Sequence, residues 1–269
     1  MLKAIMVCPN CETVYEGNYC PECGQKTVHG RYTIKALASE LIFSAFHLEK
    51  KGLPYTVKEL TIRPGIAIRH VLEGQRLSLY PPFKYLVLVG AFVVVLSLRY
   101  GFFHSDELTS ADADTYQFSV LMDHKLFFDG FFRFAEDYAT LLNLVAIPIF
   151  SFFSFLFFKE YGYNFAENLI LNTFITAQQL LFLVLLVPFI EFIPGIKHIL
   201  IPVYTVAMVV YNIIAYVQFY GTNLSNIYRA VIAVVTSYLY QFPANLGMYY
   251  IAHNYVIPYL HWVPDINLP

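Results

Sequence analysis

The sequence has few charged residues, and this scarcity limits the classes of protein to which it can belong. Asp, Glu, Lys and Arg make up 13% of the 269 residues, whereas they make up about 25% of a typical soluble domain. The 17 Lys and Arg residues are matched by 19 Asp and Glu residues, so the excess of positive charge that is typical of nucleic-acid-binding proteins is missing. Hydrophobic residues account for 58% of the chain. We therefore expect a membrane protein, and we expect no nucleic-acid partner.

Sequence motifs of catalysis are also missing. The chain contains no HExxH, GxSxG or P-loop pattern, and its histidines are scattered singly. A membrane hydrolase would need a nucleophile beside a base inside the membrane, and Ser151 and Ser154 have no evident partner in the sequence. We predict that the protein is not an enzyme.

Cysteine is absent after residue 23, and the four cysteines before that point form two CxxC turns, CPNC from Cys8 to Cys11 and CPEC from Cys20 to Cys23. Four thiolates match the tetrahedral preference of Zn²⁺ and leave no open coordination position, so we predict a structural metal rather than a catalytic one. Iron in a rubredoxin-like site fits the same spacing. A redox CxxC pair is disfavoured, because no thioredoxin-like βαβ pattern surrounds the cysteines.

Long apolar segments divide the chain into four regions. We expect a zinc ribbon over 1–30, a basic amphipathic juxtamembrane region over 31–83, a transmembrane bundle over 84–252 and an extracytoplasmic tail over 253–269. Five segments of the bundle approach the roughly 20 apolar residues needed to cross a bilayer, namely 84–103, 139–158, 166–189, 199–220 and 226–252. The predicted fold class is an all-α polytopic membrane protein with five transmembrane helices, a small N-terminal zinc ribbon and interfacial amphipathic helices.

The orientation of these segments follows from the distribution of positive charge. Of the 17 Lys and Arg residues, 11 lie at or before the start of the first segment, whereas the loop at 104–138 is acidic. Positively charged loops stay in the cytoplasm. We therefore expect the N-terminus in the cytoplasm, and the acidic loop and the C-terminus on the opposite side. In the fifth segment, Pro243 and Gly247 predict a kink or an unwound turn.

Two stretches of the juxtamembrane region, 33–52 and 64–76, carry apolar residues at helical spacing. Neither is expected to cross the membrane, so a position at the interface or beneath the bundle is favoured. Arg69 and Arg76 lie in the second stretch, and we predict that they contact lipid headgroup phosphates or a partner. The alternative is that the basic residues of this region only set the topology.

One face of the third apolar segment is polar. Its polar residues follow one another at steps of 4, 4 and 3, which places them on one side of a helix. They are Asn168, Asn172, Thr176 and Gln179. We favour hydrogen bonding between neighbouring helices as their role. An aqueous path or a groove for lipid headgroups is the alternative.

The head and the juxtamembrane region of the chain resemble a known family, and the body resembles it mainly in layout. The pattern CPNC…YCPECGQ is followed by a basic amphipathic stretch and by the spaced residues Gly65, Gly74, Arg76, Tyr80 and Pro82. This arrangement resembles a family of uncharacterised bacterial membrane proteins that join an N-terminal zinc ribbon to a multi-span domain. The resemblance implies bound zinc and a location in the bacterial inner membrane, and it implies no reaction. In layout alone, the five-span body also resembles the Yip1-type trafficking proteins.

Two functions from different classes agree with these features. In the first, the protein is a non-enzymatic inner-membrane adaptor or scaffold, whose ribbon docks a cytoplasmic protein partner while its bundle contacts membrane lipids. In the second, the bundle is a transporter or channel for a small solute or a lipid, and the polar face of the third segment lines its path. We favour the first, because the strongest motif of the sequence is a closed metal site. The polar face separates the two functions, since it should point at neighbouring helices in an adaptor and into a wet cavity in a transporter.

Overall fold

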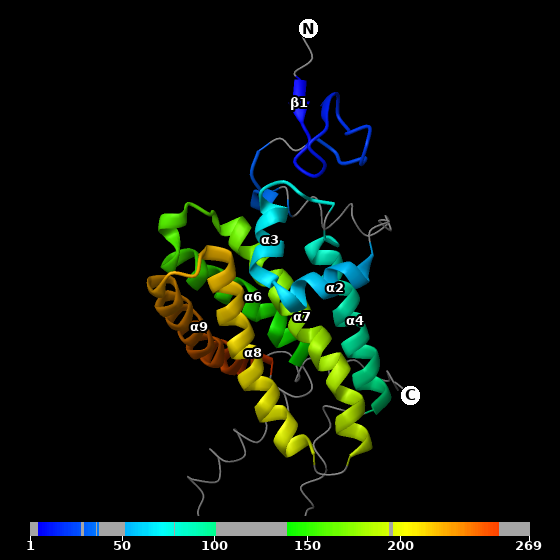
Figure 1. The fold of residues 1–269 in the computed structure, drawn as a ribbon. Helices are drawn as coiled ribbons and strands as arrows, with labels where there is room; N and C mark the ends of the chain where they lie inside the picture. The colour runs from blue at the N-terminus through cyan, green and yellow to red at the C-terminus, as the bar shows by residue number, and fades with distance from the viewer. Residues whose placement is uncertain are drawn as a thin grey trace, which may run out of the picture.

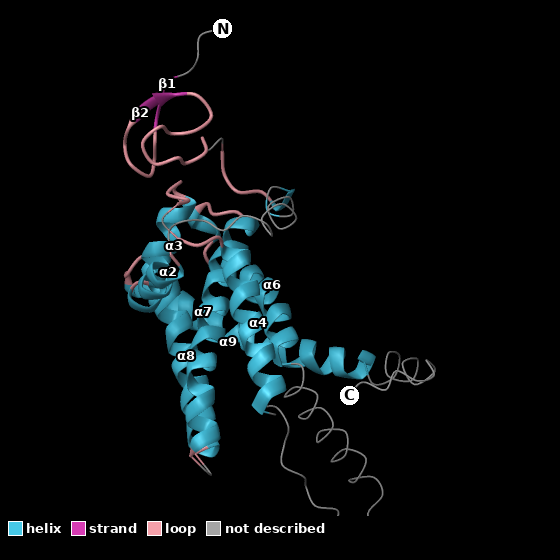
Figure 2. Cartoon of the chain, turned by 90° about the vertical axis from the view of Figure 1, so that its right-hand side faces the viewer, coloured by secondary structure: helices cyan, strands magenta, loops and turns pink. Residues whose placement is uncertain are grey.

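The computed structural model describes residues 5–27, 30–35, 37, 52–77, 79–100, 139–193 and 196–252. Within these ranges most residues lie in seven α-helices, which confirms the predicted mostly helical fold. A small β hairpin forms a head beyond one end of the helices (Figure 1), and the long helices extend away from it (Figure 2). The predicted acidic loop at 104–138 and the tail at 253–269 lie outside the described residues, as does most of the amphipathic stretch at 33–52.

The head is built on two short antiparallel strands, β1 (Ile5–Val7) and β2 (Val14–Glu16). Successive side chains of a strand point to opposite faces of the hairpin. Met6 pairs with Tyr15 on the face that packs against the cysteines, and Tyr15 is buried there. Val7 pairs with Val14 on the other face, where both side chains are exposed.

Five long helices occupy the five apolar segments that the sequence predicts. They are α4 (Pro82–Tyr100), α6 (Ala139–Phe157), α7 (Phe165–Phe192), α8 (Lys197–Tyr220) and α9 (Leu224–Ile251). By length and composition, α7 and α8 are long and apolar enough to cross a membrane, with mean hydropathies of 2.0 and 1.9 in their best windows. The apolar stretches of α4 and α6 are shorter. A crossing by all five helices stays a prediction.

Local sequence signals explain where α7 begins and how α9 continues. Asn164 caps α7, because its side-chain oxygen accepts the Glu167 N–H at 2.9 Å while the Glu167 carboxylate accepts the Asn164 N–H at 2.9 Å. In α9 the chain remains helical through Pro243. The unwound turn predicted at this proline is therefore not observed.

The juxtamembrane region contributes two short helices that pack against the bundle. They are α2 (Leu53–Ile62) and α3 (Pro64–Leu72), separated by a break at Arg63. Leu60 and Ile68 are fully buried, and the Tyr211 hydroxyl of α8 donates to the Leu60 carbonyl at 2.8 Å. The sequence left two positions open for this region, at the membrane interface or packed beneath the bundle. In the structure α2 and α3 are packed against the bundle.

At Gly65, α3 lies close against the backbone of α8. A Cβ atom at this position would lie 2.6 Å from Gln218 Cβ, and closer still to the Ala215 carbonyl oxygen. Real Cβ atoms do not approach other heavy atoms this closely. Only glycine therefore allows α3 to lie in this position against α8.

Candidate functional site

The two CxxC turns of the head have the same backbone conformation. In each turn the first cysteine donates its N–H to the carbonyl five residues further on, at 2.9 Å for Cys8 and 2.8 Å for Cys20. The residue after the second cysteine donates back to the carbonyl of the first, at 2.8 Å for Glu12 and 2.9 Å for Gly24. This residue has a positive φ in both turns, 61° at Glu12 and 75° at Gly24. Glycine adopts that conformation freely, whereas glutamate does so at a cost.

The turns bring the four predicted metal ligands together. The sulfur atoms of Cys8, Cys11, Cys20 and Cys23 all lie within 4.8 Å of one another. Two of the distances are 3.6 Å, between Cys8 and Cys23, and 3.5 Å, between Cys11 and Cys20. Sulfur atoms about 2.3 Å from a tetrahedral zinc ion would be about 3.8 Å apart, and a disulfide would be far shorter. All four cysteines are free, so the cluster fits a tetrahedral metal.

The surroundings of Cys11 favour its thiolate over its thiol. Cys8 and Cys20 are buried, whereas Cys11 and Cys23 are partly exposed. Hydrogen bonds with the Thr13 side chain and backbone lower the pKa of Cys11 to about 6. A cysteine with this pKa is largely deprotonated at neutral pH, and the thiolate is the form that binds a metal. Zinc as the metal, with iron as the alternative, stays a prediction.

Polar contacts join the head to the bundle. Gln25 Nε2 donates to the Gly74 carbonyl at 2.8 Å, just beyond the end of α3. Arg31, in the chain that leaves the head, forms an ion pair with the buried carboxylate of Glu167 and donates to the Gly162 carbonyl at 2.7 Å. The hydrogen bonds with Glu167 raise the pKa of Arg31. The head is thus attached to the same end of the bundle at which α7 begins.

The two arginines predicted to contact lipid phosphates differ in their surroundings. Arg69 donates to the last carbonyls of α8, at 2.8 Å to Gln218 and also to Phe219, and its guanidinium lies over the Phe219 ring. A cation at this place stabilises the C-terminal end of a helix. Arg76 lies over the ring of Tyr32, with 4.0 Å between its Cζ atom and the ring centroid. Contact of either arginine with lipid stays a prediction.

The predicted polar face of α7 divides into two parts, and the first part is fully hydrogen-bonded. The side-chain oxygen Oδ1 of Asn168 accepts from the Ser154 hydroxyl at 2.8 Å and from the Tyr220 hydroxyl at 2.5 Å. Asn172 accepts from the Tyr216 hydroxyl at 2.7 Å and donates to Ser154 at 3.2 Å. All these side chains are buried. Asn168 and Asn172 therefore link α6, α7 and α8, which is the packing role that we favoured.

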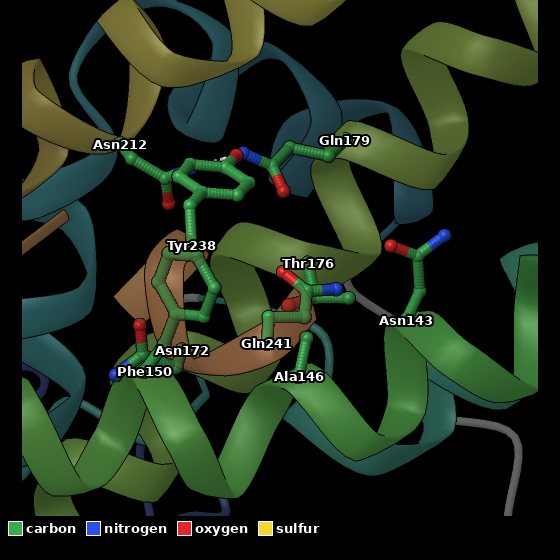
Figure 3. A pocket seen from close by; sticks show the side chains of 9 residues that line it. All are labelled: Asn143, Ala146, Phe150, Asn172, Thr176, Gln179, Asn212, Tyr238 and Gln241. Atoms are coloured by element: carbon green, nitrogen blue, oxygen red, sulfur yellow. Dashed lines mark hydrogen bonds between the residues drawn. The ribbon is translucent and has the colours of Figure 1, made fainter. Parts of the chain in front are cut away.

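The second part of the polar face borders a cavity of about 50 Å³ between α6, α7, α8 and α9 (Figure 3). Thr176 and Gln179 line the cavity from α7. Asn172, which belongs to the hydrogen-bonded part of the polar face, also contributes to the lining. Lining residues from the other helices are Asn143, Ala146, Phe150, Asn212, Tyr238 and Gln241. Gln179 and Asn212 both donate to the Met208 carbonyl, at 3.3 and 3.0 Å, so their amide oxygens remain available.

The partners of this polar face were not predictable from the third segment alone. Ser154 seemed isolated in the sequence, and the structure places its hydroxyl between Asn168 and Asn172. Tyr216 and Tyr220 are four residues apart, which is the spacing of side chains on one helical face. That spacing is the signal that could have identified them as partners of the two asparagines.

Comparisons with protein-family models, with curated proteins and with solved structures find no match for this chain. Its class is therefore defined by the fold and the sites. The protein is mostly helical, carries two helices that could cross a membrane, and holds four clustered cysteines that can bind a metal. Any function has to be argued from these features.

Proposed function

We propose that the protein is a non-enzymatic membrane scaffold that presents a metal-stabilised ribbon to a cytoplasmic protein partner. The outer face of the hairpin carries this proposal. Ile5, Val7 and Val14 are 70%, 62% and 63% exposed on that face, while the opposite face covers the cysteines. An apolar surface of this kind on a small head marks a site of protein interaction. A partner that covers the hairpin would bury all three side chains.

The attachment of the head to the bundle supports a scaffolding role. The Gln25 and Arg31 contacts fix the ribbon against the end of the bundle, so a bound partner would be held at a defined place near the membrane. The closed set of four cysteines leaves no coordination position for a substrate. The metal would therefore stabilise the docking surface and take no part in a reaction.

The proposed location is the bacterial inner membrane, with five spans, a cytoplasmic head and an extracytoplasmic C-terminus. In this topology the turn between α6 and α7 and the end of α8 lie on the cytoplasmic side. Contacts of the N-terminal region agree with it, since Arg31 reaches Gly162 and Arg69 reaches the end of α8. The end of α7 and the start of α8 lie at the opposite end of the bundle (Figure 1).

Co-purification from native membranes tests the scaffold with one variant and one matched control. Val14→Lys puts a charge on the outer hairpin face, and we expect it to reduce recovery of a specific partner roughly tenfold or more. Glu22→Lys puts the same residue in the second CxxC turn, outside the two strands of the hairpin, and should leave recovery unchanged. Equal metal content in both variants would show that the ribbon is folded. Equal recovery of every co-purifying protein with both variants would contradict the proposal.

The cavity supports a second candidate function, a path for small uncharged solutes. None of the described residues that line it is charged, and amides and hydroxyls dominate the lining. Among the described residues, the Thr176 side chain has no hydrogen-bond partner, so a solute or water can pair with it. The cavity has a volume of about 50 Å³, which is enough for a few water molecules.

Glycerol flux into proteoliposomes tests this second function. Thr176→Val keeps the shape of the side chain and removes its hydroxyl, so flux through the cavity should fall. Thr205→Val is the matched control, because the Thr205 hydroxyl is exposed on α8 and bonds only its own helix at Ile201. Flux no greater than in empty vesicles, or equal flux in both variants, would exclude the cavity as a solute path.

A further inference from the structure

A cleft of about 350 Å³ lies between the ribbon and the bundle. Gln25 and Lys26 contribute to it from the ribbon, and Tyr32 from the chain that leaves the ribbon. Arg76 and Tyr80 contribute from the segment between α3 and α4, and Phe174 from α7. The volume lies in the range of pockets that bind small molecules.

The charge of the lining favours an anionic ligand. Lys26 and Arg76 supply two positive charges, and none of the described lining residues is acidic. Arg76 is held in place by the Tyr32 ring, 4.0 Å away, which leaves its guanidinium edge free to donate. Arg69 lies outside the cleft, and its Nη2 atom donates to the carbonyls at the end of α8.

Two buried polar atoms of the lining have no partner among the described residues. One is Arg76 Nε, a donor, and the other is Gln25 Oε1, an acceptor. Gln25 is only 3% exposed, and its Nε2 atom is already bonded to the Gly74 carbonyl. Buried polar groups are normally hydrogen-bonded. A ligand that satisfies both atoms must accept from Arg76 and donate to Gln25, as a phosphate ester with a hydroxyl group does.

The remaining wall of the cleft is apolar. Leu77, Leu79, Pro82 and Phe174 form this part. A free phosphate ester would leave it unused, whereas the glycerol and first acyl carbons of a lipid would cover it. The combination of positive charge, a buried acceptor and an apolar wall matches an anionic phospholipid.

We infer that the cleft binds the headgroup of an anionic phospholipid of the phosphoglycerol type. Its phosphate pairs with Arg76 and Lys26, its headgroup hydroxyl donates to Gln25 Oε1, and its glycerol backbone lies against the apolar wall. The inference rests on the proposed membrane location of the chain. The lipid would join the ribbon to the bundle at the membrane surface and so fix the height of the docking face.

Native mass spectrometry of the full chain, purified in detergent with phosphatidylglycerol or phosphatidylcholine, tests this inference. We expect the wild type to retain phosphatidylglycerol in preference to phosphatidylcholine. Arg76→Gln should weaken retention roughly tenfold or more, because a charge-assisted hydrogen bond is lost. Lys26→Gln, on the ribbon surface, should weaken it about fivefold through charge alone. Arg63→Gln is the matched control, since the Arg63 guanidinium is paired with Glu59 outside the cleft.

Three results would overturn the inference. They are retention of both lipids alike, equal loss in Arg76→Gln and Arg63→Gln, and displacement of the lipid by millimolar glycerol phosphate, which would make the ligand a soluble phosphate ester. Metal analysis of each variant shows whether the ribbon is still folded. Partner recovery is measured separately with Val14→Lys, which lies outside the cleft, so failure of the lipid site and failure of the scaffold are distinguishable.

Discussion

The ribbon and the bundle are stabilised in different ways. The buried residues of the head are few, chiefly Cys8, Tyr15 and Cys20, and two of these three are predicted metal ligands. The bundle has one continuous apolar core that reaches from α2 to α9. A head with so small a core needs a further source of stability, which a metal at the four cysteines would supply. We therefore expect the head to depend on a metal and the bundle to fold without one.

The contacts between the two units are polar and local. Gln25 bonds to Gly74, Arg31 bonds to Glu167, and the Pro9 ring lies beside Gly74. The buried apolar clusters of the ribbon and of the bundle remain separate. Damage to one unit should therefore leave the other folded. Each of the following changes is aimed at one unit or at the junction.

Cys20→Ser should have the largest effect, and only on the head. Loss of a buried thiolate opens the metal site, and the metal supplies about 10 kcal/mol of folding free energy in small zinc domains. We expect loss of stoichiometric metal and rapid proteolysis of the ribbon, with the helical circular dichroism of the bundle unchanged. A cooperative loss of helix in the variant would mean that the two units are not independent.

Gly65→Ala should have the next largest effect, and only on the bundle. The new Cβ would lie 2.6 Å from Gln218 Cβ. Overpacking of this kind typically destabilises a protein by about 1–3 kcal/mol, and we expect about 3 kcal/mol here. Thermal unfolding of the helices should shift to lower temperature while the metal content stays constant. Gly247→Ala is the matched control, because a Cβ there meets nothing within 4 Å. Equal shifts in both variants would contradict the close approach of α3 and α8.

Arg31→Gln should have a small effect, confined to the junction. The Arg31 side chain is 58% exposed but the Glu167 side chain is only 4% exposed, so we expect the loss of this half-buried ion pair to cost about 1–2 kcal/mol. We expect faster proteolysis of the chain between ribbon and bundle, with metal content and helix content unchanged. The same increase in proteolysis in the wild type at high salt would support an ionic contact, and a rate that is insensitive to both changes would argue against it.

Glu12→Gly should have the smallest effect and should stabilise the head. Glu12 has φ 61° at the position of the first CxxC turn that corresponds to Gly24 in the second. Glycine removes the steric cost of this conformation but loses more backbone entropy on folding, so we expect a net gain in stability of about 0.5 kcal/mol. The temperature at which a chelator removes the metal should rise slightly. Gly24→Ala should lower it, and movement of both variants in the same direction would rule out backbone conformation as the cause.

Features that depend on residues close together in the sequence could be predicted, whereas contacts between residues far apart in the sequence could not. The cysteine cluster was predictable, because CxxC spacing fixes the ligand geometry locally. The five long helices were predictable from apolar length. The approach of Gly65 to α8 joins residues 150 positions apart or more, and no local pattern signals it. For the same reason, the sequence could not show that Arg69 meets the end of α8.

The polar face of α7 shows the same limit. Its four residues were assigned to one helical side, but their partners come from other helices. Asn168 and Asn172 meet hydroxyl groups of α6 and α8, whereas Thr176 and Gln179 meet a cavity. Helical spacing determines which residues share a face, and only the packing of neighbouring helices determines whether that face is filled.

We propose that a metal bound by the four cysteines holds the head together. X-ray absorption spectroscopy at the metal edge, combined with elemental analysis of the reduced full-length protein, tests it most directly. We predict one metal ion per chain with four sulfur ligands at about 2.3 Å, supplied by Cys8, Cys11, Cys20 and Cys23. The absence of stoichiometric metal, or a metal with fewer than four sulfur ligands, would contradict the account.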